Sequence, residues 1–213
     1  MHNSPKSLFI FGAGSFMRCI KHLIERTSLV MGVQYWIVDK CNSMQSKFII
    51  SENDFKKIVS EPFYFNVAVA DVRLRSRIVA DCLSLGGIPV SLISDDFIQY
   101  DDVTIGDGAI ICAKNMATTS VQVGKYFHGN IYSYIEHDCI IGDFVTFSPR
   151  VSCNGYVHIS DYVFIGAGAV IRNGVAGKPL VIGQGATIGM GAVVTKSVPD
   201  FSTVVGNPAK VMI

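Results

Sequence analysis

From Ile105 onward, apolar or small residues return at every sixth position. The register is unbroken as far as Ile171 and resumes, after an offset of five residues, from Ile182 to Val194. Four residues after most of these positions the side chain is small or β-branched. An α-helix, with its period of about 3.6 residues, cannot keep such a register on one face. The pattern therefore predicts a parallel β-helix, in which short strands form the walls of successive coils.

Three hexads that close one coil of eighteen residues would place the side chains of successive coils one above another. The predicted inner columns are Ile105, Val123, Ile141 and Ile159; Ile111, Gly129, Phe147 and Ile165; and Ala117, Ile135, Cys153 and Ile171. Each coil would hydrogen-bond to its neighbours at the strand spacing of about 4.8 Å, which leaves sheet edges only at the two ends. A β-sandwich would need turn signals about every eight to twelve residues and would not hold this phase.

The first hundred residues follow a different pattern, in which strands and helices alternate. The apolar run Ser7–Phe11 precedes a Gly12–Gly14 turn and a helical pattern through Ile20 and Ile24. Further elements are expected at Tyr35–Val38 (a strand ending at Asp39), Asp54–Val59 (helix), Phe65–Ala70 (strand), Arg73–Leu85 (helix) and Pro89–Ile93 (strand). The alternation predicts a small α/β domain with a Rossmann-like parallel sheet over residues 1–98, followed by the β-helix over residues 99–213.

Composition narrows the range of partners and compartments. The net charge of +1 gives no reason to expect nucleic acid or a membrane surface as a partner. Although 49% of the residues are hydrophobic, no apolar run reaches about eighteen residues, and the start of the chain does not resemble a signal peptide. The six cysteines include no CxxC pair, so we expect reduced thiols in a cytoplasmic protein, with Cys139 and Cys153 as interior packing.

The N-terminal turn offers a possible anion site. Backbone N–H groups of Gly12–Gly14 would lie at the start of a helix, where the dipole favours an anion such as a diphosphate. Asp39 ends the next strand and could accept from a ribose or sugar hydroxyl. The segment lacks the third small residue of a dinucleotide-binding fingerprint, and a tight turn with a capping role explains it equally well. Arg73, Arg75 and Arg77 could contact phosphate, but a solvated helix face is the favoured interpretation.

His137 is the best candidate for a catalytic residue. It stands between Glu136 and Asp138, and an imidazole beside a carboxylate is the arrangement typical of a general base. Because neighbouring side chains on a flat strand point to opposite faces, pairing of His137 with Asp138 requires a coil corner. Gly155 follows eighteen residues later, and its missing side chain should leave a slot beside the imidazole for a slender chain.

A metal site is not expected. His128, His137 and His158 occupy different phases of the eighteen-residue coil, so their imidazoles would not converge. For His128 and His158 we expect the ordinary role of satisfied surface residues.

The glycine-rich turns IGDG, IGAGAV, IGQGAT and IGMGAVVTKSVP, and the tail Val205–Lys210, resemble those of the hexapeptide-repeat acyltransferases with a left-handed β-helix. Through FIFGAG, IVD at Asp39, VAVAD at Ala70 and NIYSYIEHDCIIGDF, the whole chain is similar to the sugar acetyltransferases related to bacillosamine and perosamine N-acetyltransferases and to sialic acid O-acetyltransferases. This resemblance implies a homotrimer with active sites between adjacent β-helices. Acetyl-CoA would lie in the groove between two subunits, and the α/β domain would hold a nucleotide-linked amino sugar.

The resemblance also implies roles for individual residues. His137 would be the base and Asp138 its partner, and the small residues Gly155, Ala167 and Gly191 would border acetyl-CoA. The nucleotide sugar would be bound by Gly12, Gly14, Ser15, Asp39 and Ala70. For the oxyanion that forms on the thioester, the Gly155 N–H is the first candidate donor.

Two positions depart from the family pattern. Thr146 stands where relatives commonly have a second histidine near the thioester, and Phe16 where many have a histidine that touches the nucleotide sugar. The expected reaction is N-acetylation of a nucleotide-linked 4-amino-4,6-dideoxysugar for surface polysaccharide synthesis, with UDP, dTDP, GDP and CMP all open as the nucleotide. Sialic acid O-acetylation and a non-catalytic β-helix that binds nucleotide sugars are the alternatives.

Overall fold

The structure is a computed structural model, and it describes residues 7–39, 48–59 and 62–212. Contacts divide the chain into two compact units, residues 1–92 and 93–213. The division falls slightly before the boundary at residue 98 that the sequence suggests. Within the described ranges, no helix is long and apolar enough to cross a membrane.

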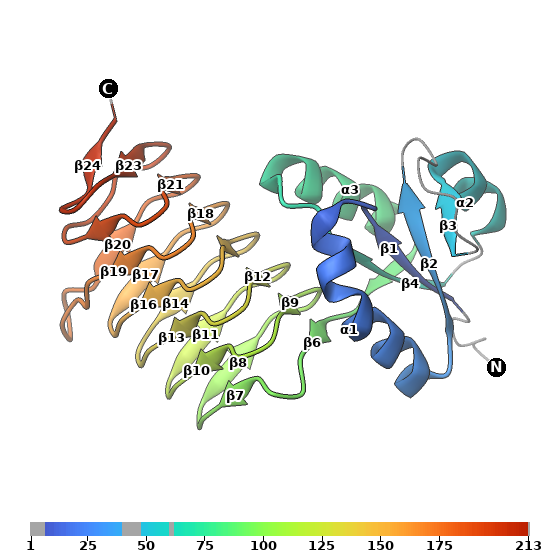
Figure 1. Cartoon of the computed structure of the whole chain (residues 1–213), viewed down its shortest axis with the longest axis horizontal. Helices are drawn as coiled ribbons and strands as arrows, with labels where there is room; N and C mark the ends of the chain where they lie inside the picture. The colour runs from blue at the N-terminus through green and yellow to red at the C-terminus, as the bar shows by residue number, and fades with distance from the viewer. Residues whose placement is uncertain (1–6, 40–47, 60–61, 213) are drawn as a thin grey trace. The chain divides into compact units, whose positions relative to one another are not determined.

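The first unit contains a five-stranded parallel sheet in the order β3-β2-β1-β4-β5 (Figure 1). Its elements are β1 (Ser7–Phe11), α1 (Ser15–Met31), β2 (Gln34–Asp39), β3 (Ile49–Ser51), α2 (Glu52–Ile58), β4 (Phe63–Val67), α3 (Val72–Ser84) and β5 (Gly87–Pro89). The predicted α/β domain with a Rossmann-like parallel sheet is confirmed. The central strands are buried along most of their length, which explains why they read as nearly continuous apolar runs.

Three strands of this unit differ from the expectation. β4 ends at Val67, because residues 68–71 leave the sheet as a loop that ends at Asp71, the N-cap of α3. The strand expected at Pro89–Ile93 is divided: Gly87–Pro89 pairs with β4, and Leu92–Ile93 forms β6 in a different sheet. β3 was not expected, because three residues are too few to show an alternating pattern.

The second unit is a parallel β-helix with three walls (Figure 1). The eight-stranded wall contains β6 (Leu92–Ile93), β9 (Ile110–Ile111), β12 (His128–Gly129), β15 (Thr146–Phe147), β18 (Phe164–Ile165), β21 (Thr187–Ile188), β23 (Thr203–Val205) and β24 (Lys210–Val211). The six-stranded wall contains β7 (Ile98–Gln99), β10 (Met116–Ala117), β13 (Tyr134–Ile135), β16 (Ser152–Cys153), β19 (Val170–Ile171) and β22 (Val193–Val194). The five-stranded wall contains β8 (Val103–Ile105), β11 (Val121–Val123), β14 (Ile140–Ile141), β17 (Val157–Ile159) and β20 (Leu180–Ile182).

The strand registers confirm the predicted columns. Ile141 pairs through its strand with Val123 on one side and Ile159 on the other, eighteen residues away in each direction. The columns through Gly129 and Ile135 are formed in the same way. Between Ile159 and Ile182 the spacing increases by the five-residue offset. From β6 to β22, consecutive strands lie on different walls, so that one coil takes one strand from each wall, and the inward side chains form a continuous apolar core. β24 pairs antiparallel with β23 on the eight-stranded wall.

The corners between walls repeat a left-handed backbone conformation. At the corner between the six-stranded and five-stranded walls, this conformation occurs at Asp102, Ser120, Asp138 and Tyr156, with φ between 55° and 57°. We call this corner the His137 corner. The corner between the eight-stranded and six-stranded walls has left-handed residues at Lys114, Tyr132, Arg150, Gly168 and Gly191, and we call it the Gly191 corner.

Candidate active site

The His137 corner brings the side chains of His137 and Asp138 together. His137 Nδ1 lies 2.8 Å from Asp138 Oδ2, and both side chains are a little under half exposed. The left-handed conformation of Asp138 lets two consecutive side chains meet, which a flat strand would not allow. The expectation that this pair requires a coil corner is confirmed.

The contact with Asp138 determines which nitrogen of His137 can act as a base. A carboxylate only accepts hydrogen bonds, so in the neutral imidazole Nδ1 carries the proton and Nε2 holds the free lone pair. The imidazole also makes a T-shaped contact with the ring of Tyr156, whose centroid is 5.2 Å away at an interplanar angle of 87°. The imidazole is thus held from two sides, with Nε2 left to take up a proton.

Gly155 lies directly against this imidazole. A Cβ atom at Gly155 would come within 2.5 Å of both Cε1 and Nε2 of His137. The prediction of a free slot over Gly155 is therefore wrong in this respect, because the ring itself fills the space left by the missing side chain. Coils stack so closely that a ring at one corner covers the backbone of the next coil. What the glycine provides is room for the imidazole.

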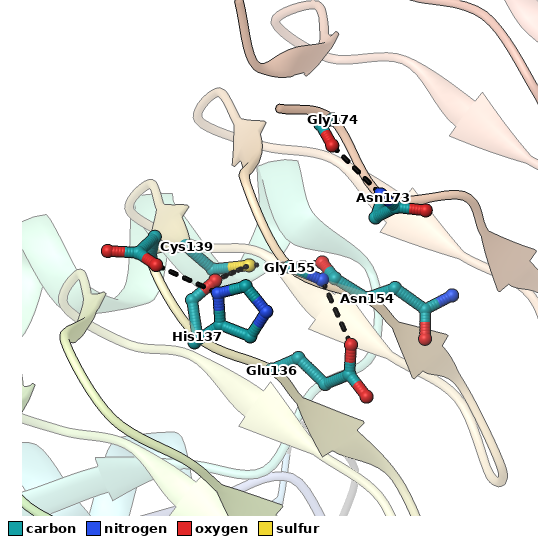
Figure 2. Close-up of polar contacts among 8 residues, drawn as sticks. Glu136, His137, Cys139, Asn154, Gly155, Asn173 and Gly174 are labelled. Carbon is teal, nitrogen blue, oxygen red and sulfur yellow. Dashed lines mark hydrogen bonds and ion pairs between the residues drawn. The ribbon is translucent and has the colours of Figure 1, made fainter. Parts of the chain in front are cut away.

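The side chain of Glu136 also contacts Gly155 (Figure 2). Its Oε2 accepts a hydrogen bond of 3.1 Å from the Gly155 N–H. The N–H expected to stabilise the oxyanion is thus bonded to a carboxylate in this structure, and the expectation of a free donor at Gly155 is not met. The sequence analysis gave Glu136 no role, although its spacing of nineteen residues from Gly155 places the two on adjacent coils.

The other two residues expected beside acetyl-CoA lie at a different corner. The Gly191 N–H donates to the Ala167 carbonyl over 2.9 Å, so these residues stack at the Gly191 corner. Gly191 is exposed, and a Cβ atom there would meet nothing within 4 Å. A single chain therefore groups Ala167 with Gly191 but does not bring them to Gly155. Thr146 lies buried on the eight-stranded wall, where it pairs with His128. His128 is also buried, so the surface role expected for it is wrong.

A basic hollow continues the His137 corner toward the C-terminus. The Gly174 N–H donates to the Gly155 carbonyl over 3.0 Å, which ties the segment 172–179 to the coil that carries Gly155. This segment contains the five-residue offset. It lines a hollow of about 370 Å³ together with residues 195–197, and Arg172, Lys178 and Lys196 contribute its positive charges. Sequence analysis missed these residues, although the break in the hexapeptide count marked their position.

The expected nucleotide-sugar residues gather at the carboxyl edge of the α/β sheet. Gly12, with φ of 103°, follows β1 and donates its N–H to Val38 over 2.9 Å. Gly14 and Ser15 begin α1 and are exposed, Asp39 ends β2, and Ala70 is exposed in the loop after β4. Because β1 lies between β2 and β4, all five positions share one edge, which is where α/β sheets bind ligands.

The start of α1 carries backbone N–H groups that favour an anion. Its N-cap, Gly14, makes no side-chain cap bond, and the first turn contains no acidic residue. The arginines of α3 divide into two kinds: Arg73 and Arg77 are exposed as expected, whereas Arg75 is fully buried. The expectation of a solvated face is therefore wrong for Arg75, since burial depends on where α3 packs and not on the local sequence.

The cysteines near the site belong to the interior. Cys139 and Cys153 are both fully buried in the core of the β-helix, which confirms their expected packing role. A hydrogen bond with Cys139 and burial together raise the pKa of Cys153 well above its usual value. Among the described residues, no three His, Cys, Asp or Glu side chains are placed together as a metal site.

Comparison with known proteins identifies the family. The chain is 46% identical over 209 residues to the GDP-perosamine N-acetyltransferase of Escherichia coli O157:H7, an alignment that covers 95% of each protein. The chain belongs to the hexapeptide-repeat sugar acetyltransferases. No family model matches it. The predicted resemblance and enzyme class, an acetyl-CoA-dependent sugar N-acetyltransferase, are thereby confirmed.

Solved structures agree with this assignment. WeeI from Acinetobacter baumannii AYE has a TM-score of 0.91 at 38% identity, covering 96% of this chain and 99% of that one. The acetyltransferase domain of PglB from Neisseria gonorrhoeae FA1090, in complex with acetyl coenzyme A, has a TM-score of 0.84 at 28% identity, covering 98% and 100%. These similarities confirm the left-handed β-helix and acetyl-CoA as co-substrate of this acetyltransferase.

Proposed function

We propose that this acetyltransferase transfers the acetyl group of acetyl-CoA to the 4-amino group of GDP-perosamine, a nucleotide-linked 4-amino-4,6-dideoxysugar. The observation that supports this most directly is the 46% identity, across nearly the whole chain, to a GDP-perosamine N-acetyltransferase. The His137–Asp138 pair supplies the general base that the reaction needs. The product would be an N-acetylated nucleotide sugar for polysaccharide synthesis. We propose a cytoplasmic location for the reaction, because acetyl-CoA is available there.

In the proposed mechanism, the unprotonated sugar amine attacks the thioester carbonyl carbon directly. The new C–N bond raises the acidity of the amine, and Nε2 of His137 accepts the proton that leaves it. When the C–S bond breaks, the CoA thiolate departs and can receive that proton from the imidazolium. Asp138 stabilises the imidazolium while it is charged and keeps the proton of the neutral ring on Nδ1. No cysteine takes part.

Glu136 has a proposed supporting role. By accepting from the Gly155 N–H, it fixes the backbone on which the imidazole rests. A catalytic base must be held within a fraction of an ångström of its productive position, so this contact serves the reaction without touching the substrate.

Acetyl-CoA is proposed to follow the His137 corner. Its phosphates would meet the positive charges of Arg172, Lys178 and Lys196 in the hollow, and its thioester would reach His137. Because Ala167 and Gly191 lie at another corner, they can border the same pantetheine arm only from a neighbouring copy. We therefore propose a homotrimer in which each groove is formed by two subunits.

The α/β domain is proposed to hold the nucleotide sugar. The diphosphate would lie over the turn Gly12–Ser15 at the start of α1, and Asp39 would accept from a hydroxyl of the nucleoside or sugar. Ala70 would border the same ligand from the loop after β4. Replacing Asp39 with Ala should then raise the KM for the nucleotide sugar and leave the KM for acetyl-CoA unchanged.

One assay tests this function. Release of the CoA thiol is followed with purified protein, acetyl-CoA and a set of acceptors: GDP-perosamine, UDP- and dTDP-linked 4-amino sugars, free perosamine and sialic acid. Fastest turnover of GDP-perosamine, with N-acetylation verified by mass spectrometry, is the expected result. Equal or faster acetylation of sialic acid would replace the proposal with O-acetyl transfer, and the absence of thiol release with every acceptor would favour a binding protein.

A further inference from the structure

The loop between β4 and α3, residues 68–71, lies against the glycine turn that follows β1. The Ala68 N–H donates to the Phe11 carbonyl over 2.8 Å. A Cβ atom at Gly12 would be 3.0 Å from the Ala68 carbonyl oxygen and 3.0 Å from Cγ2 of Val69. The strand order reverses between β1 and β4, which is the position where ligands bind to open α/β sheets. The loop and the turn thus form one surface.

Arg75 holds this loop from inside the unit. Its side chain is fully buried, and Nη1 donates to the Val69 carbonyl over 3.1 Å and to the Ala70 carbonyl over 3.4 Å. At the other end of the loop, the Asp71 carboxylate accepts from the Leu74 N–H over 2.7 Å and caps α3. The loop is therefore held at two places, by the buried guanidinium of Arg75 at Val69 and Ala70 and by the helix cap at Asp71.

Burial makes Arg75 a costly choice for packing alone. Burial lowers its pKa to about 9, an effect that the charge of Asp71 partly opposes, so the guanidinium is still protonated at neutral pH. Removing a cation from water costs free energy, and apolar residues of similar volume often replace buried ionic groups without loss of stability. A Met or Leu would pack α3 against the sheet at lower cost. The positive charge and its donors therefore point to a role beyond helix packing, in holding the loop 68–71.

We propose that Arg75 is a positioning residue for the nucleotide sugar. By holding the Val69 and Ala70 carbonyls, it sets the shape of the loop 68–71 against the Gly12 turn, and it adds a positive charge to the edge of the sheet that receives the diphosphate. The inference rests on the proposed function, because it requires the nucleotide sugar to bind at this edge. It assigns Arg75 to binding of the acceptor, with no part in acetyl-CoA binding or proton transfer.

The test compares Arg75→Met, which removes charge and donors, with Arg75→Lys, which keeps the charge but replaces the rigid planar guanidinium with an ammonium group on a flexible stem. Arg73→Met, an exposed neighbour on the same helix, is the matched control for loss of one positive charge. For Arg75→Met we expect the KM for GDP-perosamine and the Kd of GDP, measured by calorimetry, to rise about tenfold or more. Arg75→Lys should give an intermediate rise. The KM for acetyl-CoA and the kcat at saturation should stay within about twofold of wild type.

Other outcomes contradict the inference. If Arg75→Met is folded by circular dichroism and binds GDP as tightly as wild type, Arg75 has no positioning role. If Arg75→Met does not fold, the decision falls to Arg75→Lys, and a wild-type KM for the sugar in that variant overturns the inference. Failure of the proposed function looks different: wild-type protein would then reject GDP-perosamine. In that case the KM of the same variants is measured with the nucleotide sugar that the wild type does accept. If the wild type accepts no nucleotide sugar, both the proposed function and this inference are wrong.

Discussion

At the scale of the residue, His137 carries the chemistry, and its loss has a clear kinetic signature. His137→Asn should lower kcat on the order of 10²- to 10⁴-fold, because a general base typically contributes that much. The KM for acetyl-CoA should change little, since the imidazole takes a proton and does not hold the co-substrate. Steady-state kinetics with both substrates varied measures this. His158→Asn, which removes a histidine from β17, is the control and should retain wild-type turnover.

Asp138 should matter less than His137, because it orients the imidazole and does not take the proton itself. Asp138→Asn therefore should lower kcat by a smaller factor than His137→Asn. Equal losses in the two variants would mean that the tautomer set by the contact of 2.8 Å is as important as the base.

Gly155 tests how tightly the imidazole is placed. In Gly155→Ala, the added Cβ would lie 2.5 Å from Cε1 and Nε2 of His137, so the ring must leave its position. The φ angle of Gly155 lies outside the left-handed region, so backbone strain does not add to this effect. We expect a loss of kcat of about tenfold or more, in line with the sensitivity of catalysis to misplacement of the base.

The stability of the double variant His137→Ala/Gly155→Ala separates the clash between the added Cβ and the imidazole from other effects of the new methyl group. When His137 is already Ala, the space over Gly155 is empty, and adding Gly155→Ala should cost little further stability. The thermal midpoints of wild type, both single variants and the double variant give this coupling directly. Additive losses of stability would contradict the packing of the ring over the glycine.

At the scale of the element, the first coil of the β-helix is fastened by a carboxylate. Asp96 forms an ion pair of 2.9 Å with Lys114 Nζ and accepts from the Lys114 N–H and the Ser94 hydroxyl. The hydrogen bond from the Lys114 side chain, followed by those from Ser94 and the Lys114 N–H, lowers the pKa of Asp96 from 3.8 to about 2. Comparable contacts link Asp143 and Asp161 to N–H groups of earlier coils.

This shift predicts how stability depends on pH. A depressed carboxyl pKa contributes stability above pH 3.8, and that contribution is lost as the pH falls toward 2. Asp96→Asn should therefore lower the thermal midpoint at neutral pH, and the difference from wild type should shrink between pH 4 and pH 2. Asp107→Asn, at another turn of the same unit, is the control. A difference that stays constant over this range would show that the charge of Asp96 is unimportant.

The sequence predicts some elements well and others poorly, for physical reasons. The β-helix was predictable because each hexad carries the same packing constraint, so one register fixes every strand through Ile188 and beyond. β3 and β5 were not, because strands of three residues take their position from neighbours and not from their own pattern. The burial of Arg75 could not be foreseen for the same reason. The spacing of eighteen residues predicted that His137 and Gly155 are neighbours. It could not show that the imidazole itself fills the space over the glycine.

At the scale of the whole molecule, the small residues expected to border acetyl-CoA lie at two different corners of one chain. Gly155 and the basic hollow lie at the His137 corner, whereas Ala167 and Gly191 lie at the Gly191 corner. Three copies around a threefold axis can place the His137 corner of each subunit beside the Gly191 corner of the next. Each of the three sites would then draw its base from one subunit and the other border of its groove from the next.

A complementation experiment tests this arrangement. His137→Ala lacks the base but keeps an intact Gly191 corner, and Ala167→Trp blocks that corner but keeps His137. Each variant alone should be nearly inactive. When equal amounts are mixed by unfolding and refolding together, a site works only where an Ala167→Trp subunit supplies His137 to a neighbour that carries the His137→Ala change. Random assembly makes about one quarter of the sites complete, so about a quarter of wild-type turnover should return.

Native mass spectrometry provides the control, because it should show trimers that contain both variants. Mixed trimers without recovered turnover would mean that each site lies within a single chain, and the proposed groove between subunits would have to be abandoned. Recovery that requires refolding, and is absent when the folded variants are simply combined, would show that complete sites arise only when subunits assemble together. Within one chain Gly191 and His137 lie at different corners of the β-helix, so the activity of the molecule should depend on its assembly.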